Sequence, residues 1–406
     1  MEMKIRVKKC VFNSEQIEAN VTITLKSHLL KSDVADVPCG DKMAYPPLIN
    51  SHEHLISNWT PRFGDRRPYS NCAIWVEELK HSQQFIERSK VWQNDGTYAL
   101  KGTNVELLIS LGIYKNIFSG CISVQDHMPN QQDDYYEKRP IHIIKDYRQC
   151  HSVALGNWWG GRSAVEEWRE SEGRMPFIMH LAEGTDQKAK AAFSVFKNLE
   201  LLQDNSIIVH GIALSESEIK ECAKKGTTLC WCPASAMFLV GEMANIDKCL
   251  EYGVNIILGT DSTLSGSTNI LEELKFIHKI LPNMPNAEIY RMITENAQKA
   301  LFLPESYGRL RDPTPNLLIL PLKHNDPFEN LLLMNSEDIE LLVHEGVPLY
   351  GNRNYLENFS IEESAYFFFK IGDCDKFVIG HPEQIVATIG NLLGYHKEFP
   401  YLPFEW

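Results

Sequence analysis

Between about residues 48 and 303, short apolar segments alternate with longer segments that have the apolar spacing of helices. The apolar segments recur at intervals of roughly 20–30 residues, which is typical of strand–helix units in a parallel sheet. This pattern restricts the chain to α/β folds with a parallel sheet, closed or open. The predicted strands are Leu48–Asn50, Ile117–Asp126, Ser152–Gly156, Phe177–Met179, Ser206–His210, Thr227–Cys232 and Val254–Gly259, and the predicted helices are Asn104–Tyr114, Lys188–Leu202, Ser215–Lys225 and residues 285–303.

The two ends of the chain have a different, β-rich pattern. Lys4–Phe12 and Asn20–Leu25 alternate apolar and polar residues, as strands do. Further strands are predicted at Leu317–Leu322, Ile339–Val343 and Val347–Tyr350. We therefore expect three parts, which are a small β domain from residues 1–45 and 305–357, a central domain of residues 46–304, and an aromatic-rich extension of residues 358–406. The length of 406 residues suits a barrel of roughly 250 residues with additions.

Composition excludes several classes of partner. The formal net charge of −13, without a long basic run, argues against nucleic acid or an anionic membrane surface. No apolar run is long enough for a transmembrane helix, and the first residues have no apolar signal core. The ten Cys are scattered, which favours reduced, mostly buried thiols. We expect a cytoplasmic protein that binds a small molecule.

Four of the apolar segments end in residues that bind metals or transfer protons. His52-Glu53-His54 places two imidazoles on the same side of a strand end. His180 closes the next such segment, and Glu183 follows three residues later. The other two segments end at His210 and Asp261. Each pattern alone has an ordinary structural explanation, such as a packed His at a strand end or a carboxylate that caps a helix.

The four strand ends taken together indicate a function more strongly than any one of them alone. The carboxyl ends of parallel strands lie on one side of a barrel, where active sites are found. Three His and one Asp make a nitrogen and oxygen ligand set that suits Zn²⁺. A divalent ion with an open position lowers the pKa of its water to about 7, which supplies hydroxide at neutral pH.

The order His52-x-His54, His180-x-x-Glu183, His210 and Asp261 resembles the amidohydrolase superfamily, in the branch that holds cytosine deaminase and the triazine hydrolases. The likeness extends over about residues 1–355. It also includes Trp231-Cys-Pro, Gly259-Thr-Asp-Ser and Thr294-Glu-Asn-Ala. The resemblance implies a (β/α)8 TIM-type barrel, a small β-sandwich built from both chain ends, and a homodimer.

The same resemblance implies roles for individual residues. His52, His54, His180 and Asp261 would bind one divalent metal ion, with zinc the leading candidate and iron the alternative. Asp261 would also accept a proton from the metal-bound water. Glu183 would donate a proton to the leaving or ring nitrogen, and His210 would polarise the attacked centre. The resemblance would place the carbamylated Lys of binuclear relatives at the end of the Ser152–Gly156 strand, and the absence of a Lys there favours a single metal.

Several residues on the predicted loops are candidates for substrate contact. They are His127, Trp59, Arg62 and Trp158. Loops at the carboxyl ends of barrel strands commonly line the active site. The alternative for each aromatic residue is packing within its own loop.

These residues leave more than one function open. The leading hypothesis is a metal-dependent hydrolase that attacks a carbon–nitrogen bond, most simply deamination of an amine-bearing heterocycle or amidine. The same acid could protonate an amine leaving group during hydrolysis of an amide, lactam or peptide-like bond, although not as a classical endopeptidase. A degenerate barrel used only for binding is a third hypothesis. An open nucleotide-binding sheet would need a Gly-rich turn after a strand, and we find none.

Overall fold

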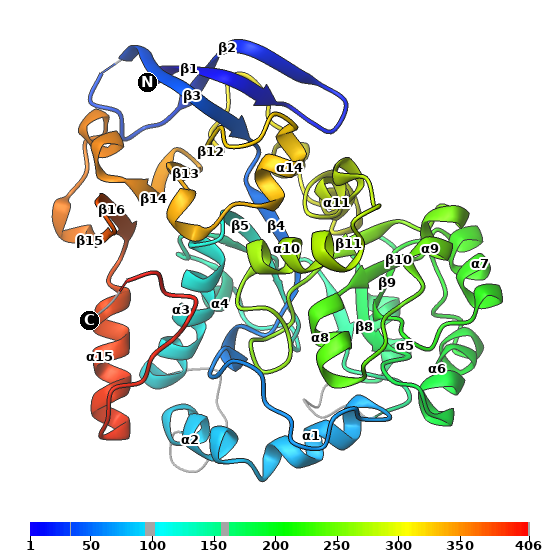
Figure 1. Ribbon diagram of the computed structural model, residues 1–406. Coiled ribbons are helices and arrows are strands. Elements are labelled where there is room, and N and C mark those ends of the chain that lie inside the picture. The colour runs from blue at the N-terminus through cyan, green and yellow to red at the C-terminus, as the bar shows by residue number, and fades with distance from the viewer. Residues whose placement is uncertain (33, 94–101, 156–161, 405–406) are drawn as a thin grey trace.

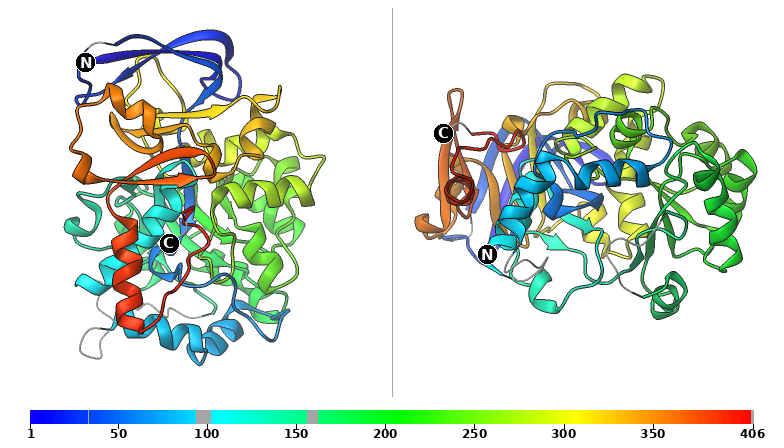
Figure 2. Two further views of the ribbon diagram at one scale, coloured as in Figure 1. Left: turned by 60° about the vertical axis from the view of Figure 1, so that its left-hand side comes forward. Right: turned by 90° about the horizontal axis from the view of Figure 1, so that it is seen from below.

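The computed structural model describes residues 1–32, 34–93, 102–155 and 162–404 (Figure 1). Within these residues the strands form a mixed sheet of eight strands and two parallel sheets of five and three strands. The mixed sheet lies at one end of the molecule, and the parallel sheets lie in the body among the helices (Figures 1 and 2). The chain is therefore a mixed α/β protein with a separate β-rich layer, as the sequence indicated.

The two parallel sheets contain the strands that lead to the candidate site. One sheet contains β4 (Leu48–Glu53), β5 (Cys121–Asp126) and β6 (His142–Ile143), and the other contains β7 (Arg148–Cys150), β8 (Phe177–Leu181), β9 (Ser206–His210), β10 (Thr228–Trp231) and β11 (Ile256–Leu258). In β8 and β9 every side chain is buried, which explains why these two strands are mostly apolar in sequence.

Helices follow most of these strands. The helix α7 shows how local sequence sets their ends, because Ser215 and Glu218 form a capping box at its start and Gly226 closes it with a φ of 78°. The helices are α1 (Cys72–Lys80), α2 (Gln83–Trp92), α3 (Thr103–Ile117), α4 (Asp133–Tyr136), α5 (Ala164–Glu170), α6 (Gln187–Asn198), α7 (Glu216–Lys225), α8 (Pro233–Leu239), α9 (Ile246–Tyr252), α10 (Ile270–Ile280), α11 (Asn286–Met292), α12 (Glu295–Ala300), α13 (Glu305–Gly308), α14 (Pro327–Leu332) and α15 (Pro382–Leu393).

The mixed sheet joins distant parts of the chain. Its strand order is β15-β16-β14-β13-β12-β3-β1-β2, so that strands from both chain ends lie side by side (Figure 2). The strands are β1 (Glu2–Val11), β2 (Ile17–Lys26), β3 (Val34–Tyr45), β12 (Leu317–Pro321), β13 (Leu341–His344), β14 (Val347–Asn352), β15 (Tyr366–Ile371) and β16 (Cys374–Ile379).

Residues 358–404 contain two strands and the helix α15. We expected a C-terminal extension here, and within it β15 and β16 continue the mixed sheet, where Phe369 of β15 stacks on Tyr350 of β14. The helix α15 then packs beside α3 and α2. Beyond α15, the side chain of Tyr401 is buried and its hydroxyl donates a hydrogen bond of 2.7 Å to the carbonyl of Asn58.

Two predicted elements were wrong. Residues 151–155 form bends and turns, and the strand lies just before them at β7, whose short and partly polar sequence hides it. The single helix predicted at residues 285–303 is divided into α11 and α12. The break falls at Ile293 and Thr294, two β-branched residues, where the Thr294 hydroxyl bonds to the Tyr290 carbonyl.

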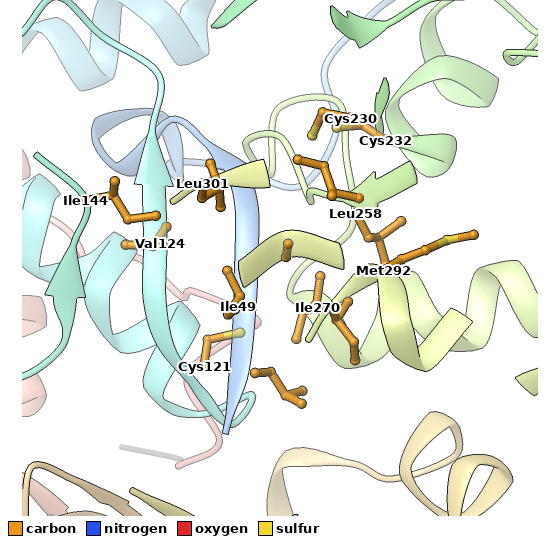
Figure 3. Packing of buried hydrophobic residues seen from close by; sticks show 14 of the residues in the cluster. Ile49, Cys121, Val124, Ile144, Cys230, Cys232, Leu258, Ile270, Met292 and Leu301 are labelled. Atoms are coloured by element: carbon orange, nitrogen blue, oxygen red, sulfur yellow. The ribbon is translucent and has the colours of Figure 1, made fainter. Parts of the chain in front are cut away.

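The main hydrophobic core fills the space between the parallel strands and the surrounding helices. Figure 3 shows members of this core, including Ile49, Val124 and Leu258, which come from three different strands. Nine of the ten cysteines are buried and all are free thiols, in agreement with the prediction. Across the part of the chain that the structure describes, no helix is both long and apolar enough to span a bilayer.

Candidate active site

The predicted site residues lie together where the parallel strands end. His52 belongs to the end of β4 and His54 follows it, while His180 lies in β8 and His210 ends β9. Asp261 follows β11, and the backbone amides of Thr260 and Asp261 both donate 3.1 Å hydrogen bonds to the His52 carbonyl. These bonds bring the end of β11 against the end of β4, although the two strands belong to different sheets.

The imidazoles form a compact cluster. The Nε2 atoms of His52 and His180 are 3.2 Å apart, and Nε2 of His54 is 3.6 Å from Oδ1 of Asp261. His180 is positioned by its other nitrogen, since Nδ1 lies 3.0 Å from the carbonyl of His151. A hydrogen bond from Nδ1 leaves the lone pair on Nε2, which is the form that binds a metal.

The cluster fits a zinc ion. Burial is the main cause that lowers the pKa of His52 and His180 well below the usual value, and nearby imidazoles lower it further. Both rings are therefore neutral and can act as ligands. Two nitrogens that bind one tetrahedral zinc ion at 2.0–2.1 Å lie about 3.3 Å apart. The observed 3.2 Å between the two Nε2 atoms agrees with that spacing.

The Asp261 carboxylate is held by a dense set of donors. Burial alone would raise its pKa, but His54, His210 and hydrogen bonds outweigh burial and lower it. The hydroxyls of Ser235 and Ser265 donate to Oδ2 at 2.8 and 3.0 Å, and the Ser262 amide donates to Oδ1 at 2.7 Å. The backbone φ of Asp261 is 56°, a left-handed conformation that costs energy for residues other than Gly. A charged carboxylate in a strained backbone is typical of a functional position.

Glu183 and His210 form the second part of the site. The Glu183 carboxyl is buried, and Oε1 lies 3.4 Å from Nε2 of His210. Burial raises the pKa of Glu183 above its usual value, even though His210 acts in the opposite direction. His210 also has a left-handed backbone, with a φ of 71°. A carboxyl whose pKa is raised keeps its proton to a higher pH than a free carboxyl does and can release that proton to a substrate.

A cavity of about 500 Å³ opens onto these groups. Its floor includes His54, His180, Glu183, His210 and Asp261. Its walls are largely apolar and come from α1, α2 and the loop after β5, with Trp75, Leu79, Phe85, Trp92, Met128 and Pro129 among them. The size and lining are those of a site for a small organic molecule.

None of the three predicted substrate contacts that the structure describes, Trp59, Arg62 and His127, is among the residues that line the cavity. Trp59 is not among the residues that line the cavity, because its buried ring packs near Phe399 and its Nε1 donates to Glu87 at 2.8 Å. Arg62 is also absent from the lining and donates to the Gly266 carbonyl beside a different cavity. Trp158 lies outside the described residues.

His127 and His151 extend the imidazole cluster beyond the predicted set. His127 is buried beside His180, with ring centroids 4.4 Å apart, and neither of its ring nitrogens has a hydrogen-bond partner. His151 follows β7 and lines the cavity, and burial is the main cause that lowers its pKa to about 3. The sequence pattern did not reveal His151, because the strand predicted there began one residue after it.

The enlarged cluster contains alternative groups of ligands. Ring nitrogens of His127, His151 and His180 lie within 4.8 Å of one another, and so do ligand atoms of His52, His54 and Asp261. A third such group consists of His52, His180 and His210, so His180 belongs to two of the three groups. His151, just after β7, holds a neutral imidazole next to the segment where the resemblance implied a carbamylated Lys in binuclear relatives.

Known proteins resemble this chain in sequence and in fold. The model of the amidohydrolase family matches residues 162–312. The chain is 33% identical over 322 residues to the 5-methylthioadenosine/S-adenosylhomocysteine deaminase of Thermococcus kodakarensis, covering 71% of this chain and 76% of that protein. The chain belongs to the amidohydrolase family. The resemblance seen in the sequence is thereby confirmed.

Other amidohydrolase matches vary in extent. The deaminase of the same description from Pyrococcus abyssi is 36% identical over 140 residues, which cover 31% of this chain and only 33% of that protein. Among solved structures, an atrazine chlorohydrolase from Arthrobacter aurescens complexed with zinc superposes with a TM-score of 0.67 at 17% identity, covering 96% of this chain and all of that one. This amidohydrolase therefore shares its fold with enzymes whose sequences have diverged widely.

Proposed function

We propose that this amidohydrolase is a metal-dependent deaminase that releases ammonia from an amine-bearing heterocycle or amidine. The observation that carries the proposal is the pair Glu183–His210, in which a buried carboxyl with a raised pKa faces the same cavity as the His and Asp cluster. Amine expulsion needs a proton donor at the nitrogen, and Glu183 provides one in the protonated form.

The proposed metal ligands are His52, His54, His180 and Asp261, with zinc as the favoured ion and iron as the alternative. The neutral imidazoles of His52 and His180, the ionised carboxylate of Asp261 and the 3.6 Å between His54 Nε2 and Asp261 Oδ1 support this set. The Arthrobacter aurescens enzyme of the same fold was solved as a complex with zinc, which also favours zinc here. When bound, such an ion supplies Lewis-acid chemistry that activates water at neutral pH.

The chain's own residues divide the proton transfers between two carboxyl groups. Asp261 is ionised, so its carboxylate accepts the proton that the attacking water loses. Glu183 donates its proton to the departing nitrogen. His210 lies next to Glu183 and steadies the charge that develops at the attacked centre. Two carboxyl groups whose environments shift their pKa in opposite directions are a common way to separate base from acid.

The cavity favours a substrate with a flat, largely apolar body. Aromatic side chains of Trp75, Phe85 and Trp92 line its walls and could stack on a heterocycle. The related deaminases are named for adenosine derivatives, which supports an aminopurine or a similar ring. The volume of about 500 Å³ can hold a ring with a substituent.

We also propose that the two parallel sheets are parts of one (β/α)8 barrel over residues 46–304, with the mixed sheet as the small β-sandwich of this family. The hydrogen bonds from residues 260 and 261 to the His52 carbonyl support closure between β11 and β4. Parallel strands followed by helices on the outside also support it.

The decisive experiment compares Glu183→Gln with the native enzyme in an ammonia-release assay over amines, amidines and amides. Metal content is measured on the same samples. We expect the variant to keep its metal and lose turnover by about 10²–10⁴-fold, since the amide cannot donate the proton. Glu242→Gln, at an exposed position, serves as the matched control and should keep full activity.

The outcomes separate the hypotheses. Normal turnover in Glu183→Gln would remove the proposed acid. Turnover of amides without ammonia release from amines would replace deamination with amide or lactam hydrolysis. Absence of metal in the native protein, even after reconstitution, would leave a binding protein as the remaining hypothesis.

A further inference from the structure

Lys115 is a fully buried cation directly behind the candidate metal site. It lies near the end of α3, and its side chain is only 1% exposed. Its Nζ atom forms an ion pair of 2.8 Å with Glu53 and donates hydrogen bonds to Thr260 Oγ1 at 3.1 Å and to the Asp261 carbonyl at 3.0 Å. It also donates to Asn58 Oδ1 at 3.1 Å. The helix itself is pressed against the site, since a Cβ on Gly112 would lie 2.6 Å from the Leu55 carbonyl oxygen.

The partner of Lys115 is tied to the His-x-His strand. Glu53 lies between the two candidate ligands of β4 and is fully buried. Its Oε1 accepts the backbone amide of His54 at 2.9 Å, and its Oε2 accepts the Thr260 hydroxyl at 3.2 Å. The carboxylate therefore fixes the backbone at His54 from the side opposite to the cavity.

The other contact of Lys115 reaches the candidate ligand Asp261. The left-handed backbone of Asp261 is unfavourable by itself and persists only where its surroundings hold it. Lys115 supplies a charged donor to the carbonyl of that residue. Loss of the donor would leave a buried carbonyl without this partner and weaken the support for the strained conformation.

We propose that Lys115 is a positioning residue for metal binding. One ammonium group couples the backbone of His54, through Glu53, to the backbone of Asp261, and so it sets the affinity of the site for its ion without touching substrate. This inference rests on the proposed metal site. The inference goes beyond the proposed metal site because it assigns control of the metal affinity to Lys115, which lies on a helix that contributes no metal ligand.

The competing explanation is that Lys115 only neutralises the buried charge of Glu53. The two explanations differ in what a double variant should do. Glu53→Gln with Lys115→Met removes both charges, so no unpaired buried charge remains and the protein should regain stability relative to Lys115→Met. The Asp261 carbonyl would still lack its donor, so a positioning role predicts that zinc affinity stays weak.

The test measures the zinc dissociation constant by competition with a chromophoric chelator, together with thermal unfolding of the metal-free protein. The samples are the native protein, Lys115→Met, the double variant and Lys376→Met. Lys376 is a matched control, because it is also buried and donates to the carbonyls of Glu337 and Ile339, but it lies in β16 of the mixed sheet.

We expect zinc binding to weaken about 10–100-fold in Lys115→Met, as for other residues that orient metal ligands from behind. The double variant should unfold at a higher temperature than Lys115→Met while binding zinc equally weakly. Lys376→Met should lose stability but keep native zinc affinity. If Lys115→Met does not fold, the double variant carries the comparison with the native protein.

Two results would overturn the inference. One is native zinc affinity in folded Lys115→Met. The other is recovery of native affinity in the double variant, which would show that charge neutralisation is the whole role. A native protein that binds no zinc or iron would instead remove the proposed function, so the two failures can be told apart.

Discussion

Gly259→Ala should weaken both the fold and the metal site, because Gly259 lies where β11 meets β4. A Cβ at this position would lie 2.5 Å from Cβ, 2.8 Å from N and 2.9 Å from O of His52. Unstrained carbon–carbon contacts are about 3.5–4.0 Å, so the two segments must separate by on the order of 1 Å. Two of the three atoms belong to the backbone, which prevents relief by rotation of a side chain.

The expected cost follows from this crowding. Overpacking of a tight core costs about 1–3 kcal/mol. The hydrogen bonds from residues 260 and 261 to the His52 carbonyl would lengthen, so Asp261 would move away from His52. We therefore expect the free energy of unfolding of the metal-free protein to fall by about 1–3 kcal/mol and zinc affinity to fall by roughly tenfold.

Urea unfolding without metal and a zinc titration measure the two effects. Gly40→Ala is the control, because no atom lies within 4 Å of a Cβ there and the position is exposed. A Gly259→Ala protein within about 0.5 kcal/mol of the control, with native zinc affinity, would refute the claim that close contact between these strand ends fixes the site.

Three individual contacts lead to further predictions. His180→Ala should lose its metal and its activity, which elemental analysis and the ammonia assay would show; retained metal would favour ligands outside the proposed set. Ser235→Ala removes a buried hydroxyl that donates to Asp261, so zinc should bind about 10–100-fold more weakly in a titration. Burial raises the pKa of Glu273 to about 7, against hydrogen bonds from Ser267 and Ala234. The pKa of this carboxyl in the unfolded chain is about 4.3. The protonated Glu273 carboxyl therefore makes its full contribution to folding stability below about pH 4.3. That contribution, on the order of 3 kcal/mol, is lost as the pH rises through 7. Glu273→Gln should flatten this part of the stability–pH curve, and an unchanged slope would contradict the assignment.

Local sequence predicted the elements whose ends have their own signals. Ser215 at the start of the predicted helix and Gly226 just past its end defined α7 closely. Apolar strands that end in His or Asp predicted which side chains meet, because parallel strands bring their carboxyl ends to one face. These signals depend on residue type and short spacing, so no distant information was needed.

The missed features depend on contacts between distant residues. The strand β7 has only three residues, and parallel pairing with β8 rather than its own pattern makes it a strand. Lys115 lies in a helix whose apolar spacing gives no sign of a buried charge, and its partner Glu53 is 62 positions away. Pairing with another strand also explains why β15 and β16 belong to the mixed sheet, because β16 pairs with β14.

The hydrogen bond from Tyr401 to Asn58 also affects how the protein is made. The two residues are 343 positions apart, and loops of that length close late because of their entropic cost. Asn58 also contacts Glu53 and Lys115. The contacts around Glu53, on the side of the site away from the cavity, are therefore complete only after residue 401 has left the ribosome. A nascent chain should therefore expose the apolar face near Trp59 for most of its synthesis. Proteolytic cleavage after α15 in the mature protein should expose the apolar face near Trp59 again. The rate at which a protease cuts this segment would therefore indicate whether the candidate site is fully assembled.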